Sequence, residues 1–173
     1  MYKFELCAFA DEASKSVSEQ IEAMASNGIK YLEARGIDGE NISDISIERA
    51  KQLKEELAAH GLAVWSLGSP IGKIDITDDF APHMEKFRHT LELARELGAK
   101  QIRLFSFYIP DGEYEKYRDE VFSRLSAFVS AAEGSGVTLC HENEKGIYGD
   151  IPERCFEIHQ AVPGIRAVFD PAN

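Results

Sequence analysis

Short apolar runs and longer amphipathic segments alternate along this chain. Each apolar run is followed by a stretch in which apolar residues recur every three or four positions, the spacing typical of a helix that buries one face. Strands are predicted at Phe4–Phe9, Lys30–Ala34, Leu62–Leu67, Gln101–Phe107, Val137–Glu142 and Ile165–Asp170. Because strand and helix alternate strictly, we expect a parallel sheet covered by helices.

The clearest helical stripe lies between the third and fourth predicted strands, and it ends before Gly98. It consists of Phe80, Met84, Phe87, Leu91 and Ala94. Two histidines of the same segment, His83 and His89, stand six positions apart and share no common face. We therefore expect both histidines to lie in solvent.

Two architectures suit this order of elements, an open doubly wound sheet and a (β/α)₈ barrel. No G-x-G-x-x-G motif follows the first strand, so the usual dinucleotide-binding signature is absent. A P-loop is excluded at residues 68–74, because its two glycines are one residue too close and Ile74 replaces the Ser or Thr that holds magnesium. A full barrel typically needs ~250 residues. This chain has 173 and stops directly after its sixth predicted strand, which indicates an incomplete domain.

The composition is that of an ordinary globular protein, with 44% hydrophobic and 28% charged residues. The net charge of −11 disfavours nucleic acid as a partner, because nucleic-acid binding depends on Lys and Arg neutralising phosphates. It equally disfavours anionic membrane surfaces. No apolar run approaches the ~20 residues that span a bilayer, and the first residues show no signal-peptide pattern. We therefore expect a cytoplasmic protein.

The three cysteines, Cys7, Cys140 and Cys155, are widely spaced. Their odd number and their spacing argue against a disulfide framework and against a zinc cluster. Cys7 and Cys140 fall inside predicted strands, so we expect both to be buried free thiols.

Candidate chemistry gathers where the predicted strands end. In parallel α/β proteins the loops that follow the strands converge, and functional side chains collect there. The polar residues at these positions are Asp11, Glu12, Glu33, Arg35, Ser69, Lys73, Ser106, Tyr108, His141, Glu142, Asn143, Asp170 and Asn173.

Glu142 is the most informative of these residues. Side chains alternate along a strand, so Glu142 shares a face with Cys140, and His141 lies on the more apolar face that should meet the helices. Asp170 occupies the equivalent place on the next strand. Two carboxylates aimed at one mouth repel unless they are protonated or bridged by a cation. Oxygen ligands suit Mg²⁺ or Mn²⁺, and an added imidazole would admit Co²⁺ or Zn²⁺. Taken singly, each carboxylate is equally compatible with a helix cap or a surface ion pair.

Six segments, each at the end of its own strand, carry a resemblance to a known family. They read FADEAS, YLEARGIDGENI, SLGSPIGKIDI, RLFSFYIPDG, HENEKGIYGDIPER and FDPAN. With them the chain resembles the sugar phosphate isomerase/epimerase family, the xylose-isomerase-like TIM barrels that also include inosose dehydratases, ketose 3-epimerases and endonuclease-IV-type enzymes. The resemblance implies an α/β fold of the (β/α) TIM-barrel type, incomplete, with about six parallel strands. It also implies a single domain over residues 1–173 that lacks the last quarter of the barrel.

The resemblance further implies roles for individual residues. Glu142 and Asp170 would bind a divalent metal, which could be Mn²⁺, Mg²⁺, Co²⁺ or Zn²⁺, together with a later histidine and glutamate beyond residue 173. Glu142 would also act as a catalytic acid or base. Asn173 stands where many relatives carry a substrate-contacting histidine, and Glu33 and Lys73 are further candidates for substrate binding.

The implied function is that of an isomerase or epimerase acting on a small sugar or sugar phosphate. In such an enzyme the metal stabilises an enediolate while carboxylates move the proton. The alternative is a non-catalytic barrel remnant that folds, or that forms a homo-oligomer by pairing its open edges with another copy. A nuclease shares the fold but is disfavoured by the strong acidity and by the absence of a multi-histidine cluster.

Overall fold

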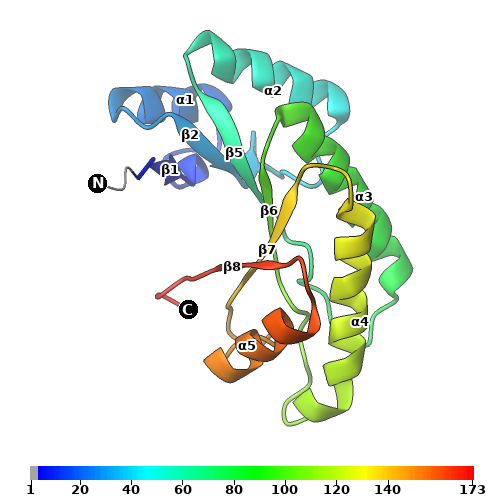
Figure 1. Cartoon of the computed structure of the whole chain (residues 1–173). Helices are drawn as coiled ribbons and strands as arrows, with labels where there is room; N and C mark the ends of the chain where they lie inside the picture. Colours follow the sequence, from blue (N-terminus) through cyan, green and yellow to red (C-terminus); the bar gives the residue numbers. More distant parts are fainter. Residues whose placement is uncertain (1–3) are drawn as a thin grey trace.

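A computed structural model describes residues 4–173, in which six parallel strands curl into part of a barrel with helices on the outer side (Figure 1). The strands pair in the order β1-β2-β5-β6-β7-β8, and every pair in this sheet is parallel. They are β1 (Cys7–Ala8), β2 (Tyr31–Ala34), β5 (Ala63–Gly68), β6 (Gln101–Leu104), β7 (Thr138–Glu142) and β8 (Arg166–Val168). The predicted α/β fold, an incomplete TIM barrel, is confirmed.

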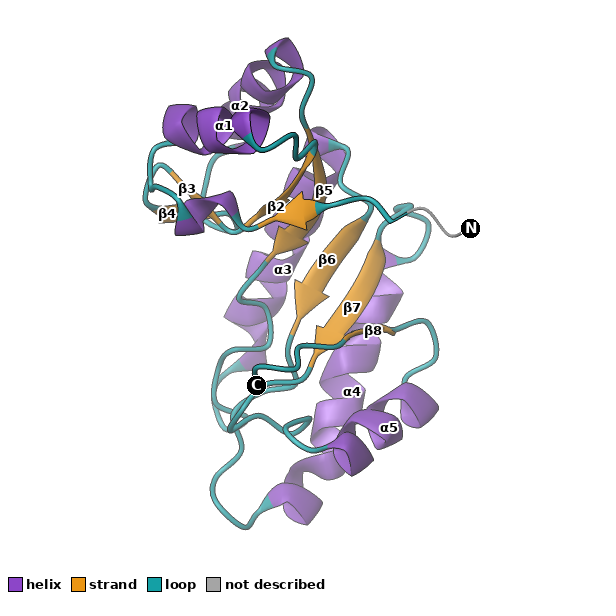
Figure 2. Cartoon of the chain, turned by 90° about the vertical axis from the view of Figure 1, so that its left-hand side faces the viewer, coloured by secondary structure: helices purple, strands orange, loops and turns teal. Residues whose placement is uncertain are grey.

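The helices that separate these strands form the outer layer, and α3 and α4 lie behind the sheet in Figure 2. The helices are η1 (Ala10–Glu12), α1 (Val17–Ser26), α2 (Ile47–Ala59), α3 (Phe80–Leu97), α4 (Tyr114–Ala132) and α5 (Pro152–Ala161). None of the helices among residues 4–173 is long and apolar enough to cross a membrane.

The core lies between the sheet and this helix layer. In register across the sheet, Leu67 lies beside Ile102 and Ile102 beside Leu139, and all three are buried against the helices. On the helix side, Phe87 of α3 packs on Phe128 of α4 with ring centroids 4.6 Å apart. Alternate residues of each strand must therefore face the concave side, where the chemistry is expected.

The fourth predicted strand ends three residues early, at Leu104. The following residues leave the sheet to bond the loop after β5: the Phe105 N–H donates to the Ile71 carbonyl at 2.8 Å, and the Phe107 N–H to the Gly72 carbonyl at 2.9 Å. Phe107 adopts a φ of 67°, in the left-handed region. The apolar run that suggested a long strand thus ties two loops of the mouth together.

A short antiparallel hairpin lies between β2 and α2, and the sequence analysis did not predict it. Its strands are β3 (Gly36–Ile37) and β4 (Glu40–Asn41). The turn residues Asp38 and Gly39 have φ values of 51° and 87°, as a two-residue turn with a left-handed backbone requires. The Asp-Gly pair is the signal in the sequence that indicates such a turn.

The prediction that His83 and His89 lie in solvent is wrong for His83, whereas His89 is partly exposed. His83 is only 7% exposed, and its Nε2 accepts a hydrogen bond from the Gly72 N–H at 2.7 Å. A ring nitrogen of His89 lies 2.8 Å from the Ile45 carbonyl oxygen. Both histidines face loops that fold over the helix layer, and helical periodicity cannot reveal such loops.

The cysteines are free thiols, as predicted, but only Cys140 is buried. Cys7 is exposed because β1 is an edge strand of the described sheet, with β2 as its one neighbour. Apolar side chains near the two sheet edges are also exposed, namely Phe4 at 88%, Leu6 at 68% and Phe169 at 80%.

Candidate functional site

Charged side chains converge on the concave face at the carboxyl ends of the strands. Arg103 of β6 stands in register with Cys140 of β7, and Glu142 lies two residues further along the same face. Burial, and after it the charge of Glu33, raises the pKa of the Cys140 thiol. Glu33 belongs to β2, which two other strands, β5 and β6, separate from β7 in the sheet order. The curl of the sheet therefore brings side chains of distant strands into one site.

Glu142 is a buried carboxylate, 6% exposed, at the end of β7. Its Oε2 lies 3.0 Å from Nη1 of Arg103, and its Oε1 accepts a longer hydrogen bond, of 3.4 Å, from Nδ2 of Asn173. Burial raises the pKa of Glu142, the Arg103 guanidinium opposes that rise, and the charges of Asp170 and Glu33 add to it. The carboxylate is therefore held in an environment that disfavours its charge, with a single cation against it.

Aromatic rings hold Arg103 in place. Its Cζ lies 5.3 Å from the centre of the Phe9 ring and 5.1 Å from that of Phe105. Gly68 provides the room, because a Cβ there would come within 3.1 Å of Phe9 and 3.3 Å of Nη2 of Arg103. Arg103 stands inside a predicted strand rather than at its end, so the sequence pattern alone assigns it no role.

Asn143 fastens Asp170 to the end of β7. The Asp170 N–H donates to Oδ1 of Asn143 at 3.0 Å, and Nδ2 of Asn143 donates back to the Asp170 carbonyl at 3.0 Å. Oδ1 of Asp170 accepts the Ala172 N–H at 2.8 Å, and Nδ2 of Asn173 donates to the Asn143 carbonyl at 2.9 Å. Asn143 and Asp170, which were predicted to lie at the ends of neighbouring strands, are thus held together next to Glu142.

Lys73 lies on the loop after β5, above the ring of Phe105, with Nζ 4.2 Å from the ring centre. It forms an ion pair of 2.5 Å with Glu144, in which both side chains are partly exposed. His83 of α3 holds this loop in place by accepting the Gly72 N–H. Burial, and after it the charges of Lys86 and Arg124, lowers the pKa of His83 to about 4.

His141 points away from the concave face, toward the helices, as its position in the strand predicted. It is 1% exposed, its Nε2 lies 2.9 Å from the Ser106 hydroxyl, and its ring packs edge-on against His159 of α5. The same hydroxyl accepts the Gly149 N–H at 2.8 Å. Burial, and secondarily His159, lowers the pKa of His141 to about 3. His141 is a neutral residue that supports the loop behind Glu142.

The described residues hold no complete set of metal ligands. Glu142 and Asp170 offer the oxygen donors that hard divalent cations prefer. Within residues 4–173, however, no group of three or more His, Cys, Asp or Glu side chains could hold a metal ion. A cavity of about 460 Å³ beside α5 is lined by Asp170 and Asn173 but not by Glu142. The chemistry of the two carboxylates suits two ligands of a larger set. The roles predicted for Glu142 and Asp170, like those predicted for Glu33, Lys73 and Asn173, stay predictions.

Solved structures share this fold over most of the chain. The probable 3-DHS dehydratase AsbF of Bacillus anthracis superposes with a TM-score of 0.78 at 18% identity, over 98% of this chain and 63% of that one. A D-tagatose 3-epimerase-like protein gives 0.70 at 22% identity, over 98% and 65%. A xylose isomerase-like TIM barrel protein from Mycobacterium smegmatis, solved in complex with magnesium, gives 0.68 at 17% identity, over 89% and 55%.

The chain spans between 55% and 65% of the length of such structures. Identities this low show the fold alone, and no curated protein matches the chain by sequence. The sequence pattern of one family does match, over residues 21–173, and the chain therefore belongs to the xylose isomerase-like TIM barrel family.

Proposed function

We propose that this chain belongs to a divalent-metal-dependent isomerase or epimerase of sugars or sugar phosphates, in which Glu142 transfers the proton. The observation that carries the proposal is the placement of Glu142, buried on the concave face beside Arg103 and within reach of the charges of Asp170 and Glu33. The fold shared with an epimerase-like protein and with a magnesium-bound protein supports it.

Isomerisation or epimerisation of a sugar begins with removal of a proton from a carbon that bears a hydroxyl group next to a carbonyl group. The ionised carboxylate of Glu142 would accept that proton. In an isomerisation its acid form would return the proton to the neighbouring carbon, whereas an epimerisation needs a second acid to deliver a proton from the opposite face. Burial and neighbouring negative charges raise the pKa of Glu142, which strengthens it as a base. Arg103 anchors Oε2, which leaves Oε1 to face the substrate, and Asn173 would orient a substrate hydroxyl there.

Glu142 and Asp170 are the residues of this chain that would bind the metal. A bound divalent cation would stabilise the negative charge that develops on the substrate oxygens. It would also relieve the repulsion between the two carboxylates, so that binding and folding become coupled.

This coupling provides the test of the proposal. We expect Mn²⁺ or Mg²⁺ to raise the melting temperature of the wild-type chain, and Glu142→Gln or Asp170→Asn to abolish the rise. Glu85→Gln is the matched control, because Glu85 is an exposed carboxylate of α3 whose partner is Arg88. An unchanged melting temperature of the folded wild-type chain in both metals would overturn the proposed metal site.

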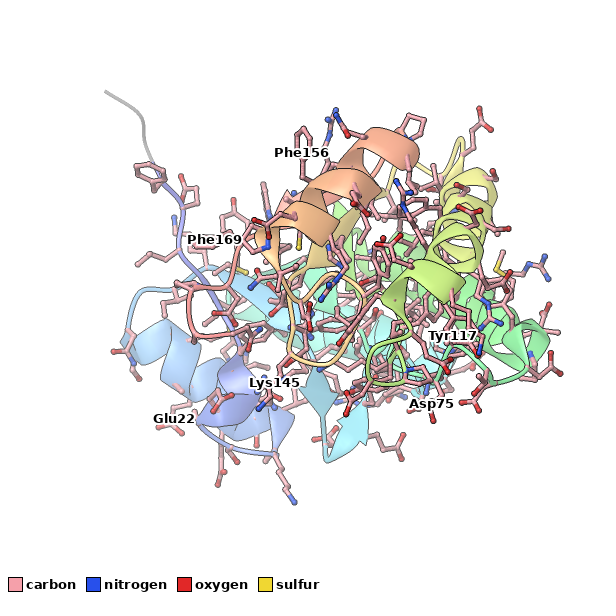
Figure 3. All side chains as sticks on the ribbon, turned by 90° about the horizontal axis from the view of Figure 1, so that it is seen from below. Glu22, Asp75, Tyr117, Lys145, Phe156 and Phe169 are labelled. Atoms are coloured by element: carbon pink, nitrogen blue, oxygen red, sulfur yellow. The ribbon has the colours of Figure 1, made fainter. Side chains whose placement is uncertain are left out.

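A second candidate is a non-catalytic unit that associates through its sheet edges. The exposed Phe4, Leu6 and Phe169 near β1 and β8 favour it, since unpaired edges with apolar side chains promote association between chains. Phe169, which directly follows β8, is labelled in Figure 3. A homo-oligomer formed in this way would bury these three side chains and need no metal.

A further inference from the structure

Three cations and two aromatic rings contact one another at the mouth of the half-barrel. Arg35 lies 4.7 Å from the Phe9 ring centre, Arg103 contacts both Phe9 and Phe105, and Lys73 lies 4.2 Å from the centre of the Phe105 ring. These five residues come from four separate segments, around β1, β2, β6 and the loop after β5. We call them the cation–ring cluster.

Arg103, which contacts both rings of the cluster, is expensive to bury. Its side chain is 11% exposed, and its Nε is a buried atom for which no protein partner is found among the described residues. A buried ion pair such as that with Glu142 rarely adds stability over a well-packed apolar pair, and an unsatisfied N–H adds a further penalty. Such unfavourable placements are typical of functional sites.

Lys73, the lysine of the cluster, can exchange its partner. Lys73 and Glu144 are 32% and 25% exposed, and partly exposed pairs of this kind contribute little to stability. An incoming anion could therefore take the place of Glu144 at low cost. Arg35 is different, because its guanidinium already forms ion pairs with both Asp11 and Glu12 and is therefore not available to an incoming anion.

We propose that Arg103 and Lys73, which both lie on the ring of Phe105, form an anion-binding subsite beside Glu142 for a carboxylate or phosphate group. A guanidinium presents several N–H donors in one plane, which matches both groups, and an ammonium adds a mobile point charge. If the proposed function holds, the substrate is a sugar acid or a sugar phosphate rather than a neutral sugar. Anion binding itself does not depend on that function.

The test follows the side-chain N–H signal of Arg103 by NMR, assigned from its loss in Arg103→Lys. Inorganic phosphate and formate are titrated separately at constant ionic strength against chloride. We expect a saturable shift with phosphate, with formate or with both, which identifies the anionic group. We further expect Lys73→Gln to weaken that binding about tenfold. Lys145→Gln is the matched control, since Lys145 is an exposed lysine of the neighbouring loop (Figure 3) and should change nothing.

Two results would overturn the subsite. One is an Arg103 N–H signal that moves linearly with the concentration of both phosphate and formate, without saturating, or that moves equally in chloride. The other is binding that survives unchanged in Lys73→Gln. The metal-dependent rise in melting temperature reports on Glu142 and Asp170 separately, so the subsite and the proposed function can fail independently.

Discussion

His83 should make the stability of the fold depend on pH in a way that one substitution removes. Its Nε2 accepts the Gly72 N–H at 2.7 Å, so the bond requires the neutral ring. The rings of Phe107 and Phe128 both pack against it, with centroids 6.4 and 6.1 Å away. The unfolded chain binds a proton here below the ordinary pKa of 6.5, whereas the folded chain does so only below about 4. Stability is therefore present above pH 6.5 and is lost as the pH falls through this window.

The size of the effect follows from the two pKa values. A difference of 6.5 against about 4, at 1.36 kcal/mol per unit, corresponds to about 3 kcal/mol lost between neutral pH and pH 4. His83→Gln can keep an acceptor for Gly72 but does not titrate, so its stability should lack this contribution. His83→Leu leaves the Gly72 N–H unsatisfied and should cost about 1–3 kcal/mol at every pH.

Urea unfolding of the wild type and the two variants, repeated from neutral pH down to pH 4, measures these quantities. The free energy of unfolding of the wild type, relative to that of His83→Gln, should fall by about 3 kcal/mol over this range. The relative measure cancels other titrating groups, including His141. Equal pH dependence in the wild type and His83→Gln would refute the reasoning.

Three further predictions rest on single features of the structure. Arg103→Met leaves the Glu142 charge buried without its cation and should cost about 3–5 kcal/mol in urea unfolding; adding Glu142→Gln should recover part of the loss, and fully additive losses would contradict this. Gly149→Ala places a Cβ 2.4 Å from Cε1 of His141 and should destabilise by about 1–3 kcal/mol, so wild-type stability would show that the site is not tightly packed. Light scattering should give a mass above the 19.3 kDa of one chain if the edges pair, whereas a monomer at high concentration would exclude that association.

The alternation of apolar strands and amphipathic helices was sufficient to predict the architecture. Period-two and period-3.6 patterns report which side chains meet the core, and the core is what orders β2, β5, β6 and β7 against the helices. The position of Glu142 on the concave face and of His141 on the helix side followed from the same alternation. The direction in which each side chain points is a local property of one strand, so it can be predicted from the sequence of that strand alone.

Contacts between separate loops could not be predicted in this way. His83 and Gly72 meet because the loop after β5 folds back over α3, and the backbone of Phe105 and Phe107 pairs with that loop instead of extending β6. Arg103 was passed over because it stands inside a predicted strand, and its contacts with Phe9 and Glu142, both far from it in the sequence, could not be read from periodicity. Periodicity describes neighbours along the chain and carries no information about such pairs.

The central claim is that Glu142 and Asp170 act together on one divalent cation. Electron paramagnetic resonance of free Mn²⁺, titrated against the wild type, Glu142→Gln, Asp170→Asn and the Glu85→Gln control, tests it most directly. We predict that the wild type and the control bind Mn²⁺ alike and that each of the other two variants binds about tenfold more weakly. Equal Mn²⁺ affinity in all four proteins, or no binding by the folded wild type, would contradict the claim.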